Sequence, residues 1–337
     1  MRVAIVAPPW APIPPDLYGG IEQAVDTLAR GIHRAGHEVM LFTTGDSTCP
    51  VPRRWLLAAA EGQRIGSAVP EVRHVMAAYD VACEYDIVHD HTVVGPLYSE
   101  RYPELHVVTT VHGPLDEDLI DLYRRLGTRV PIIGISEAQR RPAPHIPIAQ
   151  VIHHGVDPEA FAVGPGGDYC LFLGRMAPEK GPHRAIAAAR KAGVPLILAG
   201  KLREPKEHMF FEKEVAPLLG EDVEYVGEVS QAEKERLLGG ARATLFPIRW
   251  NEPFGLVMLE SLACGTPVLA FPEGAVPEVV EHGRTGAICR DESEMAEAIA
   301  SAGEFDRSAC RAAVEGYFSM DRVVNDHLEL FEQLLAA

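Results

Sequence analysis

Residues 251–269 read NEPFGLVMLESLACGTPVL, a stretch that combines a loop, an apolar helix and a buried strand in direct succession. Pro253 and Gly255 are unfavourable inside a helix, so the regular apolar run begins after Gly255, and it ends at Gly265. This pattern predicts one short, mostly buried helix. The amides at about positions 254–256 then lack carbonyl partners and lie at the positive end of the helix dipole. We expect an anion there, and a phosphate is the anion that best fits a helix start.

Two glutamates eight positions apart belong to this stretch. Glu252 lies in the loop, and Glu260 lies about a turn inside the otherwise apolar helix. An ionised carboxylate in that position is costly unless hydrogen-bond donors reach it, and a vicinal diol such as that of a ribose supplies two. The alternative is that Glu260 pairs with an arginine or a backbone amide while Glu252 caps a helix. The stretch alone does not separate these two interpretations.

Composition limits the classes of function. The chain has 337 residues and 47% hydrophobic content, enough for about two domains with a core each. Its formal net charge is −17 and its pI is about 5.3. Nucleic acids and anionic membranes are bound by basic surfaces, so both are disfavoured as partners. Any phosphate site must therefore be local and pre-organised.

The six cysteines are scattered, with no CxxC pair and no metal-ligand spacing. They are expected to be reduced core thiols in a cytoplasmic protein. The apolar residues 1–7 are too few for a signal peptide and are stopped by Pro8 and Pro9, so they are expected to form a first strand. No stretch is long and apolar enough to span a membrane.

The first half of the chain predicts a parallel sheet. A buried strand at 2–8, a loop containing Gly19 and Gly20, a helix at 22–36 and a strand at 37–44 form a βαβ unit. Further strands are expected at 86–91, 106–112 and 131–136. The carboxyl ends of parallel strands line the ligand crevice of such a sheet. The polar side chains at these ends are candidate ligands by position: His91, His112, Ser136 and Glu137.

Two features of this half allow alternative interpretations. Arg53, Arg54, Trp55 and two leucines within 51–60 could touch a membrane surface, but a short surface helix is the interpretation we favour. The triplet at 89–91, with His112, suggests a metal site. Alternation along a strand sends His89 and His91 to one face and Asp90 to the other, so the triplet cannot bind one ion as a set. We therefore predict no metal site.

The second half repeats the alternation after a Gly-rich segment at 158–168, which has the composition of a linker. Strands are expected at 168–175, 195–201, 223–229, 243–249, 267–271 and 286–289. The intervening helices are expected at 179–193, 206–219 and 230–241, with a final amphipathic helix at 320–335. The most economical architecture is an α/β protein of two Rossmann-like domains with parallel sheets that face each other across a cleft.

The motif GRMAPEKG at 174–181 leaves a strand and enters a helix. This position places Arg175 and Lys180 at the crevice edge of the second sheet. The planar fork of arginine and the point charge of lysine suit a diphosphate. Taken singly, each residue could equally be a surface cation, paired for example with Glu179.

Several short motifs occur together along the chain: YGGIE at 18–22, HG at 112–113, SE at 136–137, GRMAPEKG at 174–181, EPFGLVMLE at 252–260 and ACGTPVLA at 263–270. On these motifs the chain resembles the retaining glycosyltransferases of family 4, which have the GT-B fold, over essentially its whole length. The resemblance implies an acceptor-side Rossmann-like domain at 1–157 and a nucleotide-sugar donor domain at 158–317. A helix at about 318–337 would be able to pack back onto the first domain.

The resemblance also assigns each candidate residue to a part of the donor. Arg175 and Lys180 would hold the diphosphate. Glu260 would accept the ribose hydroxyls, and Glu252 and His112 would grip hydroxyls of the donor sugar. Backbone groups would contribute at the diphosphate and at the base, from the following residues: Gly19, Gly20, Val229, Phe254, Gly255 and Leu256.

The resemblance implies a front-face mechanism, because no residue is placed as a covalent nucleophile. Arg175 and Lys180 would replace a divalent ion, so no metal and no cofactor is expected. Asp116 and Asp118 form a DxD string, which we interpret as chance near a helix start. Two departures from the family concern His154, where the family often has asparagine, and the first domain, which is shorter than is common.

The sequence leaves the substrates open. UDP-hexose is the favoured donor and GDP-mannose the second, and the acceptor is a small molecule or glycan that no residue identifies. The linkage formed and the oligomeric state are equally undetermined. Two other functions use the same residues: a GT-B epimerase of a sugar nucleotide, and a sugar-nucleotide-binding protein without turnover.

Overall fold

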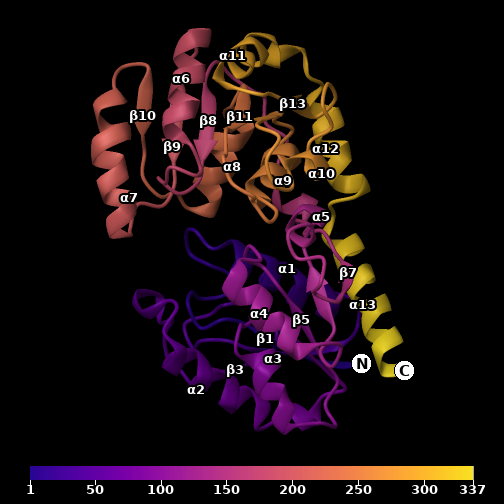
Figure 1. Cartoon of the computed structure of the whole chain (residues 1–337). Helices are drawn as coiled ribbons and strands as arrows, with labels where there is room; N and C mark the ends of the chain where they lie inside the picture. The colour runs from indigo at the N-terminus through magenta and orange to yellow at the C-terminus, as the bar shows by residue number, and fades with distance from the viewer. Residues whose placement is uncertain (337) are drawn as a thin grey trace. The chain divides into compact units, whose positions relative to one another are not determined.

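The computed structural model describes residues 1–336 and divides into two compact units, each with its own sheet (Figure 1). Unit 1 comprises Met1–His154 together with the C-terminal segment that begins at Met320, and unit 2 comprises Gly155–Ser319. Each sheet is built from strands that pair in parallel and helices that connect them. This is the α/β arrangement expected from the repeated βαβ pattern.

Unit 1 contains a seven-stranded sheet in the order β3-β2-β1-β4-β5-β6-β7, in which every pairing is parallel. Its strands are β1 (Arg2–Val6), β2 (Glu38–Phe42), β3 (Arg53–Arg54), β4 (Ile87–Asp90), β5 (Val107–Thr110), β6 (Ile132–Gly134) and β7 (Ile148–Val151). The strand order reverses between β1 and β4. Ligands of open α/β sheets bind outside the carboxyl ends at such a reversal.

The helices of unit 1 cover both faces of this sheet. They are α1 (Gly20–Arg34), α2 (Ala68–Tyr79), α3 (Gly95–Tyr98), α4 (Glu117–Leu126), α5 (Glu137–Arg140) and α13 (Met320–Ala336). The C-terminal helix α13 packs against α1, and its Val324 and Phe331 share one buried core with Val25 and Ile32 (Figure 1). Arg322 of α13 also donates to the carbonyl oxygen of His153 at 2.7 Å. Helix α13 thereby fixes the backbone of the segment that follows β7.

Unit 2 contains a six-stranded parallel sheet in the order β10-β9-β8-β11-β12-β13. Its strands are β8 (Cys170–Leu173), β9 (Leu196–Ala199), β10 (Val223–Tyr225), β11 (Ala243–Phe246), β12 (Val268–Ala270) and β13 (Gly286–Ile288). Its helices are α6 (Pro182–Ala192), α7 (Pro205–Phe210), α8 (Gln231–Gly240), α9 (Leu256–Ala263), α10 (Val276–Val279), α11 (Glu292–Ser301) and α12 (Arg307–Gly316). Here the order reverses between β8 and β11.

Helix α9 is held at its carboxyl end by arginines of α12. Arg307 donates to the carbonyl oxygen of Cys264 at 3.1 Å and Arg311 to that of Ala263 at 2.9 Å. Cations are favourable at this end because the last carbonyl groups of a helix carry partial negative charge. The amino end of α9 remains directed toward the loops that follow β8 and β11.

The structure departs from the sequence predictions in four places. Residues 51–60 contain no helix, so the predicted surface helix is wrong; Arg53 and Arg54 instead add a two-residue edge strand beside β2. Strand β7 was not predicted. The segment 158–168, which has linker composition, is packed within unit 2, where Gly164 N donates to the carbonyl oxygen of Cys264. Five of the six cysteines are buried as expected, but Cys83 is exposed.

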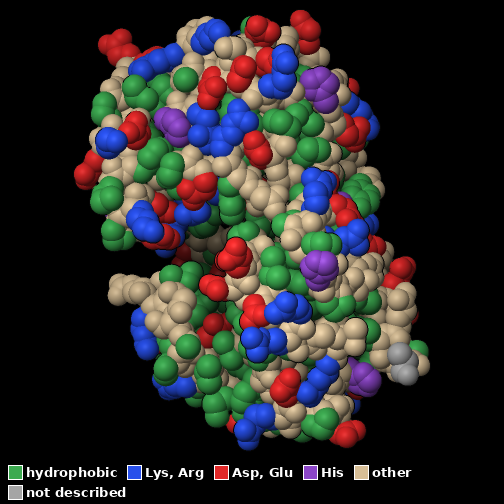
Figure 2. Space-filling model, in the orientation of Figure 1, with side chains coloured by type: hydrophobic (Ala, Val, Ile, Leu, Met, Phe, Trp, Pro, Cys, Tyr) green, Lys and Arg blue, Asp and Glu red, His purple; other side chains and the backbone are tan. Residues whose placement is uncertain are grey.

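The charged surface agrees with the composition. Figure 2 shows acidic and basic side chains interspersed over the visible face, with no continuous basic area. Within residues 1–336, no helix has the length and apolar character needed to cross a bilayer. The polar features that suggest a ligand lie instead at the carboxyl ends of strands.

Candidate functional site

The two loops at the strand-order reversal of unit 2 are joined by backbone and side-chain contacts. The loop at 174–181 follows β8, and the loop at 247–255 follows β11. Arg249 N donates to the carbonyl oxygen of Glu179 at 2.9 Å, and Arg184 Nε donates to that of Pro247 at 2.8 Å. These contacts bring GRMAPEKG and NEPFG, about 70 residues apart in sequence, to one edge of the sheet.

Lys180 and Glu252 form a buried ion pair at this edge, with side chains each 11% exposed. Trp250 joins them: its indole Nε1 donates to Glu252 Oε2 at 2.7 Å, and Lys180 Nζ lies 4.7 Å from the centroid of its ring. A buried ion pair that also has hydrogen-bonding and cation–π partners is fixed in orientation. Lys180 and Glu252 are therefore presented together.

Arg175 lies at the end of β8 between two carboxylates. Its guanidinium donates to Glu179 at 2.8 Å and to Glu207 at 3.2 Å. Burial would raise the pKa of Glu207, but the amides of Arg203 and Glu204, together with nearby cations, hold that pKa below its ordinary value. Glu207 is thus a buried carboxylate that stays ionised and keeps Arg175 charged and in place.

Helix α9 begins where the sequence predicted, because Gly255 adopts the left-handed conformation with φ +89°. A Cβ at Gly255 would lie 3.0 Å from the ring of Phe246, so both backbone angle and space require glycine there. Phe254 is buried and Leu256 is the first residue of the helix. The amino-terminal turn of α9 therefore follows directly on the loop that carries Glu252.

Glu260 lies on the second turn of α9, only 6% exposed, and pairs with Lys234 of α8. This is the structural alternative anticipated for Glu260, with lysine in place of arginine. Val229 lies just before α8, whose N-cap Ser230 accepts a hydrogen bond from Glu233 N. Val229 therefore immediately precedes the helix that supplies Lys234, and this lysine balances the charge of Glu260.

Sequence reasoning missed three residues of this edge: Glu207, Lys234 and Trp250. Glu207 and Lys234 act through partners 32 and 26 positions away on other elements, and Trp250 acts through Glu252 in the same loop. Trp250 could have been noticed, because a tryptophan two positions before a buried glutamate can donate its indole N–H to that glutamate. Lys234 and Glu207 lie in ordinary helix-start patterns that carry no such signal.

The predicted residues of unit 1 fall at two places. Gly19 is the N-cap of α1 and Gly20 its first residue, after the Pro-rich loop that follows β1. His112 follows β5, and its Nε2 lies 2.8 Å from Nδ1 of His91. Its ring also stacks on that of His154, with centroids 5.4 Å apart. Ser136 accepts from Gln139 N as the N-cap of α5.

His112 belongs to a series of neighbouring imidazoles, of which His89, His91 and His327 are buried and His112 and His154 are partly buried. The rings of His89 and His91 are 4.1 Å apart on one face of β4, as alternation predicted, and His327 of α13 lies 5.2 Å from His89. Asp90 turns to the opposite face and accepts from Tyr79 at 2.9 Å. Among residues 1–336, no three His, Cys, Asp or Glu side chains are grouped so that they could hold a metal ion. Asp116 of the DxD string is the N-cap of α4, as anticipated.

We expect unit 1 to lose stability as pH falls below about 6.5, the value of an unfolded histidine. Burial lowers the pKa of His74, which lies on α2 outside this series, and of His327 to about 4. Burial together with neighbouring imidazoles lowers the pKa values of four further histidines well below their ordinary range. These four are His89, His91, His112 and His154. Between the folded and unfolded values the unfolded chain binds more protons, so the free energy of unfolding decreases by up to about 1.4 kcal/mol per pH unit and histidine.

Asp90 and Glu22 act in the opposite direction, since burial raises the pKa of Asp90 to about 7 and also raises that of Glu22, but they are two groups against these six histidines. Chemical denaturation at pH 7.5 and 5.5 tests the prediction. His327→Leu should reduce the difference between the two pH values. Equal or greater stability at pH 5.5 would contradict the assignment of neutral, buried histidines.

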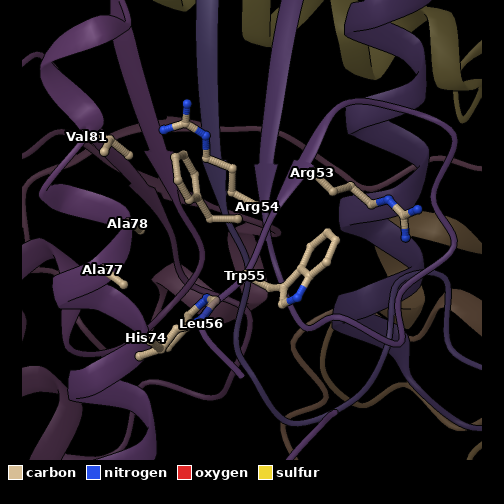
Figure 3. A pocket seen from close by; sticks show the side chains of 9 residues that line it. Arg53, Arg54, Trp55, Leu56, His74, Ala77, Ala78 and Val81 are labelled. Carbon is tan, nitrogen blue, oxygen red and sulfur yellow. The ribbon is translucent and has the colours of Figure 1, made fainter. Parts of the chain in front are cut away.

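A hollow of about 350 Å³ lies between α2 and the edge strand β3 of unit 1. Figure 3 shows Arg54, Leu56 and His74 on the side of α2, with Arg53 directed away. Arg54 forms a half-exposed ion pair with Glu84 at 3.8 Å. The lining residues are Phe42, Arg53, Arg54, Trp55, Leu56, His74, Ala77, Ala78 and Val81. None of them is among the predicted site residues.

Gly274→Ala is expected to displace the backbone of Glu252, because the added methyl group would collide with it. Gly274 has φ +55°, and an added Cβ would lie 2.3 Å from the carbonyl oxygen of Glu252 and 2.4 Å from its nitrogen. Gly283→Ala is a matched control, because Gly283 has φ +82° but no atom within 4 Å of the added Cβ. We expect the Gly274 variant to be less stable than the control by about 1–3 kcal/mol in denaturant titrations, the usual cost of overpacking. Equal stability would show that the backbone of Glu252 is not held rigidly.

Two family models together span residues 18–312. The family described as Glycosyltransferase Family 4 matches residues 18–160, and Glycosyl transferases group 1 matches residues 157–312. Among curated relatives, a glycogen synthase of Mycobacterium tuberculosis is 25% identical over 372 aligned positions, covering 93% of this chain and 88% of its own.

Solved structures show the same fold. AviGT4, a glycosyltransferase involved in avilamycin A biosynthesis, is 25% identical, with a TM-score of 0.78 and coverage of 100% of this chain and 98% of its own. HepE of Anabaena, solved in complex with UDP and glucose, is 20% identical, with a TM-score of 0.78 and coverage of 99% and 100%.

Two parallel sheets with reversed strand order, matched along their whole length by these structures, define the GT-B class of glycosyltransferase folds. The sequence prediction of fold class is confirmed. The chain belongs to glycosyltransferase family 4, since the two family models match consecutive halves of it.

Proposed function

We propose that this glycosyltransferase moves a hexose from a nucleoside-diphosphate sugar, with UDP-hexose as donor, to an acceptor hydroxyl with retention of anomeric configuration. The observation that carries the proposal is the assembly of Arg175, Lys180 and Glu252 beside the start of α9 at the strand-order reversal of unit 2. Cations and helix amides suit a diphosphate, and a buried carboxylate suits sugar hydroxyls. The complex of HepE with UDP and glucose supports the choice of donor.

Each catalytic group has a place in this proposal. The bond between the sugar C1 and the diphosphate oxygen breaks as charge grows on the diphosphate, which Lys180 and Arg175 stabilise. The acceptor hydroxyl attacks the same face of C1 and passes its proton to the departing phosphate oxygen. Glu252 and His112 are proposed to hold hydroxyls of the donor sugar during this step. No metal or cofactor is part of the proposal.

Both cations that the proposal assigns to the diphosphate already take part in ion pairs. Lys180 is neutralised by Glu252, and Arg175 by Glu179 and Glu207. A diphosphate competes for these cations, and in exchange the sugar hydroxyls must satisfy Glu252. The pairs keep both cations positioned before the donor arrives, so little reorganisation is needed on binding.

Glu260→Ala is expected to weaken nucleotide binding by about 1.5–3 kcal/mol, the scale of hydrogen bonds to a charged group. The reason is that Glu260, which pairs with Lys234, is proposed to accept hydrogen bonds from both ribose hydroxyls. Calorimetric titration with UDP and with 2′,3′-dideoxy-UDP measures the effect. The variant should bind both ligands alike, whereas the wild type should prefer UDP. Unchanged affinity for UDP would remove the ribose assignment.

Product analysis tests the function itself. The protein is first screened for thermal stabilisation by UDP, GDP, ADP and dTDP, because a ligand that binds only the native state raises its stability. The matching sugar nucleotide is then incubated with an acceptor panel, with and without EDTA. A new glycoside with the donor's anomeric configuration, formed equally in EDTA, is the expected result. An isomerised sugar nucleotide would indicate an epimerase, and binding without any turnover a non-catalytic protein.

A further inference from the structure

We propose that Trp250 is a positioning residue that keeps Glu252 correctly oriented when the donor diphosphate draws Lys180 away. This inference rests on the proposed function. It concerns one carboxylate oxygen, Glu252 Oε2, which accepts from both Lys180 Nζ and the indole Nε1 of Trp250, the latter at 2.7 Å. The three side chains thus meet at a single atom.

Binding of the donor changes the balance of charge at this atom. The side chain of Glu252 is 11% exposed, so water cannot readily replace a lost cation. If Lys180 turns toward phosphate oxygens, the carboxylate loses its positive partner in a poorly solvated site, which favours a change of rotamer. The indole N–H is a neutral donor, so the diphosphate does not attract it as it attracts Lys180. The hydrogen bond from Trp250 to Oε2 is therefore kept when the donor binds.

The ring of Trp250 has a second contact with the same pair. Lys180 Nζ lies 4.7 Å from the ring centroid, a cation–π distance. The backbone is fixed as well, because Glu252 N donates to the carbonyl oxygen of Trp250 at 2.8 Å. The indole therefore contacts Lys180 with its ring face and Glu252 with its N–H. Two substitutions of Trp250 can separate these two contacts.

Trp250→Phe removes the N–H and keeps an aromatic face, whereas Trp250→Leu removes both. For Trp250→Phe we expect kcat/KM with UDP-hexose to fall about 10-fold, the effect of losing one hydrogen bond to a charged group. Its affinity for UDP, which lacks the hexose whose hydroxyls Glu252 is proposed to bind, should change less than about twofold. Trp250→Leu should weaken UDP as well, because Lys180 also loses its aromatic contact.

A double-mutant cycle tests whether Trp250 acts through Glu252. In a Glu252→Gln background, Trp250→Phe should change kcat/KM by less than about twofold, because the charge that the N–H supports is absent. A full 10-fold loss in that background would overturn the proposal. So would equal losses of UDP and UDP-hexose binding in Trp250→Phe, the result expected of a purely structural tryptophan.

A nuclear magnetic resonance measurement separates failure of this inference from failure of the proposed function. The protein has three tryptophans, and Trp250→Phe identifies the indole ¹⁵N–¹H signal of Trp250. That signal should move in Glu252→Gln without any ligand, and should move again when UDP-hexose is added to the wild type. A signal that ignores UDP-hexose while the wild type forms glycoside refutes the positioning role alone. If no sugar nucleotide shifts the indole signal of the wild type, raises its melting temperature or yields a glycoside, both proposals are refuted.

Discussion

Lys180→Ala is expected to reduce kcat/KM for glycosyl transfer by on the order of 10²–10³, the usual cost of removing one group that stabilises transition-state charge. The loss should fall mainly on kcat, because the charge on the departing diphosphate grows as the glycosidic bond breaks. Lys180 is nine-tenths buried and already orientated by Glu252 and Trp250, so its contribution needs little rearrangement.

Initial-rate kinetics with the donor identified by product analysis measure this effect. Lys191→Ala is the matched control, since Lys191 is an exposed lysine of α6 in the same unit whose Nζ donates to Ser293. The melting temperature of Lys180→Ala is compared with that of the wild type, so that a loss of activity caused by unfolding is recognised. A folded Lys180→Ala protein within about threefold of wild-type activity would contradict the role assigned to Lys180.

Arg175→Ala is expected to lower kcat/KM by about 10², and Arg175→Lys by less, because lysine keeps the charge but loses the planar fork. The fold should tolerate either change. Glu207, the buried partner of Arg175, still accepts from the amides of Arg203 and Glu204 at 2.9 and 3.1 Å. Its charge would therefore not be left without donors.

Arg190→Ala serves as the control for Arg175, because Arg190 forms an exposed ion pair with Asp222 at 2.7 Å in the same unit. Exposed pairs of this kind contribute about 0–1 kcal/mol to stability and should not affect the rate. Steady-state kinetics of the three arginine variants, at saturating acceptor, compare them directly. If Arg175→Ala and Arg190→Ala behave alike, Arg175 is not part of the site.

The sequence was most informative where a local rule applied. The start of α9 could be predicted because Gly255 adopts a backbone conformation that few other residues tolerate, and its end because Gly265 follows the last apolar residue. The order of strands and helices could be read from apolar runs and glycine stops. Each of these signals lies within a few neighbouring residues.

Features that depend on tertiary contact could not be predicted. Arg53 and Arg54 form a strand only because β2 offers them a free edge, and two arginines carry no strand signal of their own. Likewise the pairs Lys180–Glu252 and Lys234–Glu260 join residues 72 and 26 positions apart. For Glu260 the sequence left diol and ion pair as alternatives, and the structure shows a carboxylate whose charge is already balanced by Lys234.

The histidines of unit 1 illustrate the same limit from the opposite direction. Strand alternation was sufficient to show that His89 and His91 share a face without Asp90, as the structure confirms. It could not show that His327, more than 200 positions later, completes the series from α13. A local pattern excluded the triplet as a metal site, but only the fold reveals the buried imidazole cluster.

The central claim is that the diphosphate of a sugar nucleotide is bound by Arg175 and Lys180 beside the amino end of α9. A crystal structure of the protein with UDP tests it most directly. We predict phosphate oxygens within hydrogen-bonding distance of both cations and of the backbone at 254–256, with Lys180 withdrawn from Glu252. A diphosphate bound elsewhere, with Lys180 still paired to Glu252 and Arg175 to Glu179 and Glu207, would contradict the claim.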